Sequence, residues 1–136
     1  MSAICGIYHL DHKPLCIDTL GVGMDALADY GADGSDAWCA GAVGLGHQMT
    51  YTTPESLFER LPLKMNNLVI TADARLDNRE SLCDLLDISH TDRGTITDSQ
   101  LILYSYGKWG EDCPTHLLGD FAFAIWERWR GWSVIR

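Results

Sequence analysis

The spacing of hydrophobic and polar positions over the first thirty residues predicts a strand followed by a helix. Residues 3–9 form a short apolar run with the length of a buried strand. Residues 17–30 place apolar side chains at helical spacing, which predicts an amphipathic helix. Gly31 follows this pattern directly, and we expect it to end the helix as a left-handed cap.

The central part of the chain predicts two further strands separated by a loop. Residues 38–49 are strand-like and rich in glycine, which indicates a bend or the close approach of another backbone. Residues 51–62 have the composition of a loop. Residues 67–76 form a second apolar strand, and Asp73 lies near its end.

The last sixty residues predict two helices and a strand hairpin. Residues 77–78 can cap a short helix whose apolar positions fall within 82–86. Thr97 and Gln100 have the spacing of a capping box, which opens a longer helix that runs to about residue 109. A helical turn is expected to close at residues 117–118.

Residues 121–126 then form a strongly apolar strand, residues 130–131 a turn, and residues 132–136 the hairpin partner of that strand. No strand–helix–strand alternation is sustained along the chain, so we predict mostly antiparallel sheets with helices packed outside them. The 136 residues suffice for one domain, and the last predicted strand stops at the final residue. We therefore expect the chain to be the N-terminal part of a longer protein.

Composition and charge limit the kinds of partner that this chain is expected to bind. The net charge of −9 argues against nucleic acid or an anionic membrane as the main partner. No apolar stretch is long enough for a transmembrane helix, and no secretory signal opens the chain. The five cysteines are odd in number and lack CxxC spacing, which predicts reduced thiols in a cytoplasmic protein. The histidines are scattered, so no metal site is expected.

The second residue carries candidate chemistry. Ser2 becomes the chain terminus if the initiator Met1 is removed, which is usual before a small residue. An N-terminal Ser, Thr or Cys can use its own α-amine as the general base for its side chain. That amine has an ordinary pKa of about 7.7–8.0, so it can accept a proton near neutral pH.

Six stretches, in the right order along the whole chain, resemble the class II glutamine amidotransferase domain that opens the asparagine synthetases. Each motif is weak alone, but together they are specific. The stretches are Ser2-Ala3-Ile4-Cys5-Gly6-Ile7, residues 27–34, Leu45-Gly46-His47-Gln48-Met49, residues 73–78, Thr97-Asp98, and residues 119–126 with the sequence Gly-Asp-Phe-Ala-Phe-Ala-Ile-Trp.

The resemblance implies a four-layer αββα N-terminal-nucleophile hydrolase fold, of class α+β, with two stacked antiparallel sheets between helices. It also implies glutamine hydrolysis: an N-terminal Cys attacks the side-chain amide, an Asn side chain and a Gly backbone N–H stabilise the oxyanion, and an Arg and an Asp hold the glutamine. The released ammonia would pass to a C-terminal synthetase domain, which uses ATP and magnesium. The amidotransferase domain itself needs no cofactor, and the family allows a homodimer.

This chain departs from the family pattern at most of the glutamine-pocket positions. Ser2 replaces the nucleophilic Cys, and a hydroxyl is far less acidic than a thiol. Met49 replaces the Arg that binds the glutamine carboxylate. Asp73 replaces the oxyanion Asn, and Ala74 replaces the oxyanion Gly. Among the polar binding residues only Asp98 is kept.

These losses predict a domain that kept the fold and lost the glutaminase, as in β-lactam synthetases and lasso peptide cyclases, which the pattern resembles. Its role would be to support an ATP-dependent amide-forming domain. One alternative is an active glutaminase with Ser2 as nucleophile. Another is a module that binds a different small molecule in the old pocket. A shifted register, with Cys5 as the nucleophile, fits the apolar spacing less well than Ser2 does.

Overall fold

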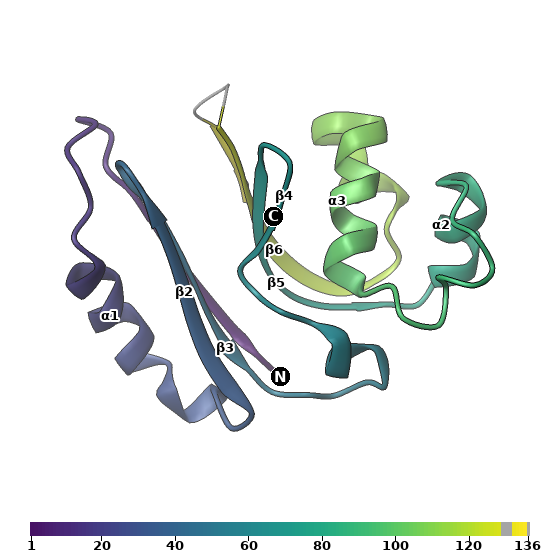
Figure 1. Ribbon diagram of the computed structural model, residues 1–136, viewed down its shortest axis with the longest axis horizontal. Helices are drawn as coiled ribbons and strands as arrows, with labels where there is room; N and C mark the ends of the chain where they lie inside the picture. Colours follow the sequence, from purple (N-terminus) through teal and green to yellow (C-terminus); the bar gives the residue numbers. More distant parts are fainter. Residues whose placement is uncertain (129–131, 136) are drawn as a thin grey trace.

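Two antiparallel sheets lie face to face between helices (Figure 1). The computed structural model describes residues 1–128 and 132–135. Sheet A has the strand order β1-β3-β2 and consists of β1 (Ala3–Tyr8), β3 (Val43–Met49) and β2 (Gly34–Ala40). Sheet B has the order β4-β5-β6-β7 and consists of β4 (Leu63–Met65), β5 (Leu68–Leu76), β6 (Gly119–Glu127) and β7 (Trp132–Ile135).

Helices cover the outer face of each sheet. Helix α1 (Ile17–Ala26) packs on sheet A, and α3 (Asp98–Trp109) packs on sheet B with α2 (Arg79–Leu85) beside it (Figure 1). The described residues also form three 3₁₀ helices: η1 (Ala28–Tyr30), η2 (Glu55–Phe58) and η3 (Gly110–His116). This α+β arrangement in four layers is the predicted fold class. No helix in the described part of the chain is long and apolar enough to cross a membrane.

Strand β5 is buried on both faces, which explains its apolar sequence. Val69 points toward sheet A and packs with Leu45 of β3. Its neighbour Ile70 points the other way, into the large core beneath α3. Because successive strand residues alternate between faces, one apolar run serves two cores. The end of the same strand carries Asp73 toward the N-terminus of the chain.

Several predicted elements are confirmed by the structure. Thr97 and Gln100 form the capping box that begins α3: the Gln100 N–H donates to Thr97 Oγ1 at 3.2 Å, and the Thr97 N–H donates to Gln100 Oε1 at 2.9 Å. The helix ends before Gly110, as predicted. Strand β7 is the antiparallel partner of β6. The turn predicted at residues 130–131 lies outside the described residues.

Other predictions were wrong because turns were missed. The single strand predicted at residues 38–49 is a hairpin of β2 and β3, turned at Gly41, whose φ of 56° is left-handed. A second hairpin joins β4 to β5 through Asn66, which also has a positive φ of 55°. The helix predicted at residues 17–30 stops at Ala26 and continues as η1, and Gly31 has a φ of −100°, so it is no left-handed cap. The helical turn expected at residues 117–118 lies earlier, in η3.

Candidate functional site

Ser2 lies just before β1 with its side chain held by the backbone that follows β3. Its hydroxyl donates to the Thr50 carbonyl oxygen at 3.2 Å and accepts from the Thr50 N–H at 3.0 Å. The residue is 8% exposed. A hydroxyl has one proton to donate, so in this arrangement the proton of Ser2 is committed to a structural bond.

Asp73 meets Ser2 from the opposite sheet. Its Oδ1 accepts a hydrogen bond from the Ser2 backbone nitrogen at 3.2 Å. The contact joins β5 of sheet B to the start of β1 in sheet A, so the stacking of the two sheets brings together two residues that the sequence separates by 71 positions. The structure therefore unites the predicted nucleophile position with the predicted oxyanion position.

The cleft around these residues has a volume of about 20 Å³. Met49 and Ala74, two further predicted positions, are among its lining residues, and Met49 is 8% exposed. A cavity of this size holds about one water molecule, whereas small-molecule sites commonly measure about 300–1,000 Å³. The buried Met49 side chain is one of the groups that fill the cleft.

Asp98 lines the same cleft, but other protein groups satisfy its carboxylate. The Leu76 N–H donates to Oδ2 at 3.2 Å, and the Arg79 guanidinium is paired with Oδ1. Arg79 also donates to the Ile96 carbonyl oxygen at 2.6 Å. Asp98 is 5% exposed, and burial raises the pKa of its carboxyl despite the nearby Arg79. Arg79 was not among the predicted site residues, since nothing in the local sequence pattern marks it as the partner of Asp98.

Two more buried polar residues line the cleft, His47 and Glu59. His47 Nδ1 lies 3.3 Å from Thr71 Oγ1, and burial lowers the pKa of its imidazole to about 4. Glu59 accepts a hydrogen bond from the Ser99 N–H at 3.0 Å, and burial raises the pKa of its carboxyl. His47 is therefore neutral at pH 7 and suits a structural role better than that of a base. Glu59 had no place in the predicted site, because its approach depends on the loop after η2.

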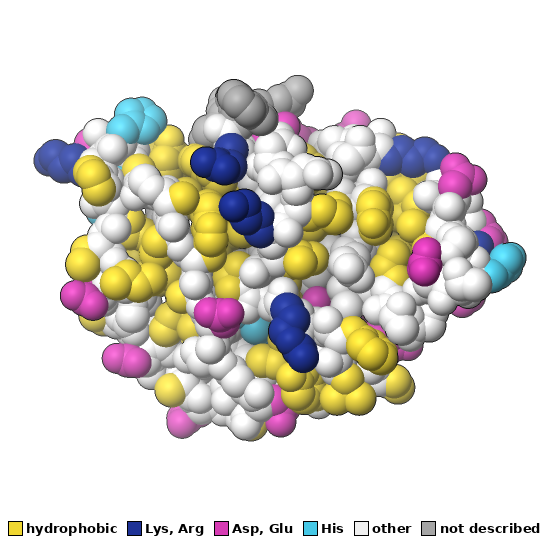
Figure 2. Space-filling model, in the orientation of Figure 1, with side chains coloured by type: hydrophobic (Ala, Val, Ile, Leu, Met, Phe, Trp, Pro, Cys, Tyr) yellow, Lys and Arg dark blue, Asp and Glu magenta, His cyan; other side chains and the backbone are white. Residues whose placement is uncertain are grey.

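The cleft is acidic and offers no cation to a carboxylate. Its lining includes Glu55, Glu59, Asp73 and Asp98, and neither Lys nor Arg is found among the described residues that form it. Arg79, which is paired with the cleft residue Asp98, does not itself line the cleft. On the face drawn in Figure 2, acidic side chains are spread among hydrophobic and uncharged ones instead of gathering in one patch.

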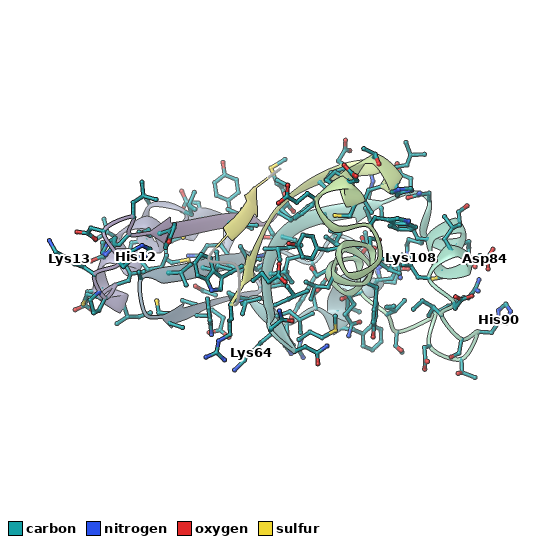
Figure 3. All side chains as sticks on the ribbon, turned by 90° about the horizontal axis from the view of Figure 1, so that it is seen from above. His12, Lys13, Lys64, Asp84, His90 and Lys108 are labelled. Atoms are coloured by element: carbon teal, nitrogen blue, oxygen red, sulfur yellow. The ribbon has the colours of Figure 1, made fainter. Side chains whose placement is uncertain are left out.

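Other titratable side chains lie far from this cleft. His12 and Lys13 lie at one end of the molecule and Asp84 and His90 at the other, away from the space between the sheets (Figure 3). Within the described residues, no three His, Cys, Asp or Glu side chains are close enough to hold a metal ion.

The alternative nucleophile, Cys5, lies inside β1 with its Sγ 3.4 Å from Met24 Sδ of α1. Burial raises the pKa of this thiol, which disfavours the reactive thiolate. None of the five cysteines, all of which lie in the described part of the chain, forms a disulfide. The geometry favours the register that places Ser2, and not Cys5, in the cleft.

Comparison with known proteins gives two matches. A family model described as a glutamine amidotransferase domain matches residues 1–136. The glutamine-hydrolyzing asparagine synthetase 3 of Bacillus subtilis (strain 168) is 32% identical to this chain over 110 residues. That match covers 78% of this chain and 18% of the Bacillus protein, so the chain spans less than a fifth of the length of that relative.

Proposed function

The chain belongs to the glutamine amidotransferase domain family and is related to an asparagine synthetase, and from that premise we propose that it has lost glutaminase activity while keeping the fold. The observation that carries this proposal is the Asp73 carboxylate against the nitrogen of Ser2. In a processed chain that nitrogen would be the α-amine, which has to be neutral to act as a base.

Asp73 opposes catalysis in two ways. A carboxylate next to the α-ammonium stabilises its protonated form, so the base is withheld. The same carboxylate stands at the position where the family places an oxyanion donor. Removal of one such donor costs about 10²–10³ in rate, and a negative charge in its place also repels the developing oxyanion.

Substrate binding is weakened at both ends of glutamine. Among the described residues the cleft has no cation for the α-carboxylate, and Asp98, which the family uses for the α-amine, is paired with Arg79. The volume of about 20 Å³ leaves no room for an amino acid. The same small volume argues against a stand-alone module that binds another ligand in the Ser2 cleft.

The domain would instead support an ATP-dependent amide-forming domain that follows it in a longer protein. The relative from Bacillus is named as a glutamine-hydrolyzing asparagine synthetase, and more than four fifths of its length lies outside the match. ATP and magnesium would bind in that following part, which would use an amine other than ammonia from glutamine. Five cysteines that form no disulfide among the described residues support a cytoplasmic location.

The test is a glutaminase assay on the full chain, with intact mass used first to establish whether Met1 has been removed. We expect no release of glutamate or ammonia from glutamine above the level of a Ser2→Ala control. Turnover by the processed chain that disappears in Ser2→Ala would overturn the proposal and establish the alternative, a glutaminase with Ser2 as nucleophile.

A further inference from the structure

The backbone nitrogen of Ser2 is held in place by contacts that do not involve Met1. The Ser2 hydroxyl donates to the Thr50 carbonyl oxygen and accepts from the Thr50 N–H. The next residue, Ala3, begins β1, which is paired with β3. Met1 is 75% exposed, whereas Ser2 is buried. Removal of Met1 would therefore leave the Ser2 nitrogen where it lies, 3.2 Å from Asp73 Oδ1.

Removal of Met1 changes the charge at this nitrogen. In the chain that keeps Met1, the nitrogen belongs to a neutral amide, whose one N–H donates to Asp73. Hydrolysis of the Met1–Ser2 peptide bond consumes one water and leaves free methionine and an α-amine on Ser2. Below the ordinary pKa of such an amine, about 7.7–8.0, it is an ammonium with three N–H donors. The hydrogen bond to Asp73 then becomes charge-assisted, and such bonds are roughly twice as strong as neutral ones.

The rest of the cleft also favours a positive charge at this nitrogen. Neither Lys nor Arg is among the described residues that line the cleft. The carboxylate of Asp98 is paired with Arg79, whereas Asp73 has the Ser2 nitrogen as its hydrogen-bond partner among the described residues. The volume of about 20 Å³ admits a group the size of a water molecule, such as an ammonium on Ser2, and leaves no room for a separate cationic ligand.

We propose that this cleft binds the chain's own N-terminal ammonium, so that removal of Met1 strengthens the attachment of sheet A to sheet B. Ser2 precedes β1 of sheet A, and Asp73 lies in β5 of sheet B, so the ion pair joins the two sheets directly. The ion pairs between side chains of the described residues do not link one sheet to the other. A chain that keeps Met1, or whose Ser2 amine is acetylated, has a neutral amide at this position and loses the ionic link.

The Ser2 amine would then serve the fold instead of proton transfer, so this role rests on the proposed loss of glutaminase. It adds a dependence of stability on N-terminal processing, which the loss of glutaminase alone does not require. Unfolding is measured without glutamine, so a failure of this proposal and a failure of the proposed function are seen in separate experiments.

The experiment compares the free energy of unfolding in urea, at pH 6.5, for three forms of the chain whose N-termini are established by intact mass. One form begins with a free Ser2 amine, one carries an Nα-acetyl group on Ser2, and one keeps Met1. The acetyl group takes the place of the exposed Met1 backbone. We expect the folding equilibrium constant of the free-amine form to be about tenfold larger than that of the acetylated form, because a hydrogen bond to a charged group replaces a weaker one. The form with Met1 should lie close to the acetylated form.

Asp73→Asn, made in the free-amine and the acetylated forms, should remove most of this tenfold difference. Asp29→Asn is the control, because Asp29 is exposed on η1 and does not line the cleft. It should leave the difference between the two forms unchanged.

If Asp73→Asn fails to fold, the salt dependence of the unaltered chain decides the question. Salt screens an ion pair, so the difference between the free-amine and acetylated forms should shrink as NaCl is raised to about 1 M. Equal stability of the two forms, a difference that salt does not change, or an undiminished difference in a folded Asp73→Asn variant would overturn the proposal. The contact between Ser2 and Asp73 would then be an ordinary hydrogen bond.

Discussion

Asp73 Oδ1 accepts a hydrogen bond from the nitrogen of Ser2 at 3.2 Å, and this contact ties the end of β5 to the start of β1. In a chain processed to Ser2, the same contact would place the Asp73 carboxylate beside the α-amine and favour the protonated form of that amine. The relationship can be tested without any substrate.

In a chain lacking Met1, Asp73→Asn should make the Ser2 amine deprotonate at lower pH. The variant removes the negative charge that stabilises the ammonium, and a nearby opposite charge commonly shifts a pKa by about one unit or more. The measurement is the pH dependence of α-amine acylation, followed by intact mass. Asp29→Asn, an exposed substitution on η1, is the control and should leave the midpoint unchanged. If the pH midpoint of acylation is the same in Asp73→Asn and in the unaltered chain, Asp73 does not hold the Ser2 amine in its protonated form.

Arg79→Met should destabilise the fold by about 3 kcal/mol, because it leaves the buried Asp98 carboxylate without its counter-charge. The Arg79 and Asp98 side chains are 18% and 7% exposed. Arg75→Met is the matched control, since Arg75 pairs with Asp120 on the surface at 2.9 Å with side chains 55% and 85% exposed. Such a pair contributes about 0–1 kcal/mol. The free energy of unfolding of both variants is measured in urea at pH 7. Equal losses in the two variants would contradict the assignment of Arg79 as the counter-charge of the buried Asp98.

Gly119→Ala should be more destabilising than an ordinary surface change. Gly119 has a φ of 141°, and an added Cβ would collide with the carbonyl oxygen of Arg75 on the neighbouring strand. The backbone of β5 cannot move without disturbing Asp73, so we expect a loss of about 3 kcal/mol or more. Gly94→Ala, which meets open space, is the control and should change stability by less than about 1 kcal/mol. Thermal unfolding of the two variants gives the comparison.

Local signals allowed much of this fold to be predicted from sequence. The capping box of Thr97 and Gln100 is complete within four residues, and the doubly buried β5 is a continuous apolar run. The hairpin turns at Gly41 and Asn66 were missed because neither interrupts the apolar pattern strongly enough to separate two strands. At both turns the available signal was the residue type, because glycine and asparagine tolerate a positive φ.

The site was predicted less completely, because its polar contacts are tertiary. The positions of Ser2 and Asp73 followed from the family resemblance, and the structure brings them together. The pairing of Arg79 with Asp98 crosses from α2 to the start of α3, and Glu59 reaches Ser99 over 40 positions. No periodicity or spacing in the sequence encodes such partners.

His47 should make the fold less stable in acid. The pKa of its imidazole is about 4 in the folded chain against 6.5 ordinarily, so between these values the unfolded chain binds more protons. Stability should therefore be full above pH 6.5 and fall by about 3 kcal/mol as the pH drops toward 4. Urea unfolding from pH 7 to 4.5 should show this slope in the unaltered chain and a flatter slope in His47→Gln. His90→Gln, at the exposed end of the molecule, should keep the original slope (Figure 3).

Glu59 changes the stability of the fold with pH in the direction opposite to that of His47. Burial raises the pKa of its carboxyl above the ordinary 4.5, so the folded chain binds more protons than the unfolded chain between 4.5 and the higher folded value. The contribution of Glu59 to stability is therefore greatest below pH 4.5 and is lost as the pH rises through its folded pKa. Glu59→Gln removes this titration and keeps an acceptor for the Ser99 N–H. The stability of Glu59→Gln relative to the unaltered chain should accordingly increase with pH.

The decisive quantity is the difference in unfolding free energy between Glu59→Gln and the unaltered chain, measured in urea at intervals from pH 4 to 8. Using the difference cancels the opposing contribution of His47, which both chains share. The same difference for Glu55→Gln should stay flat, because Glu55 is only partly buried. A flat difference for Glu59→Gln as well would mean that its carboxyl is solvated in solution.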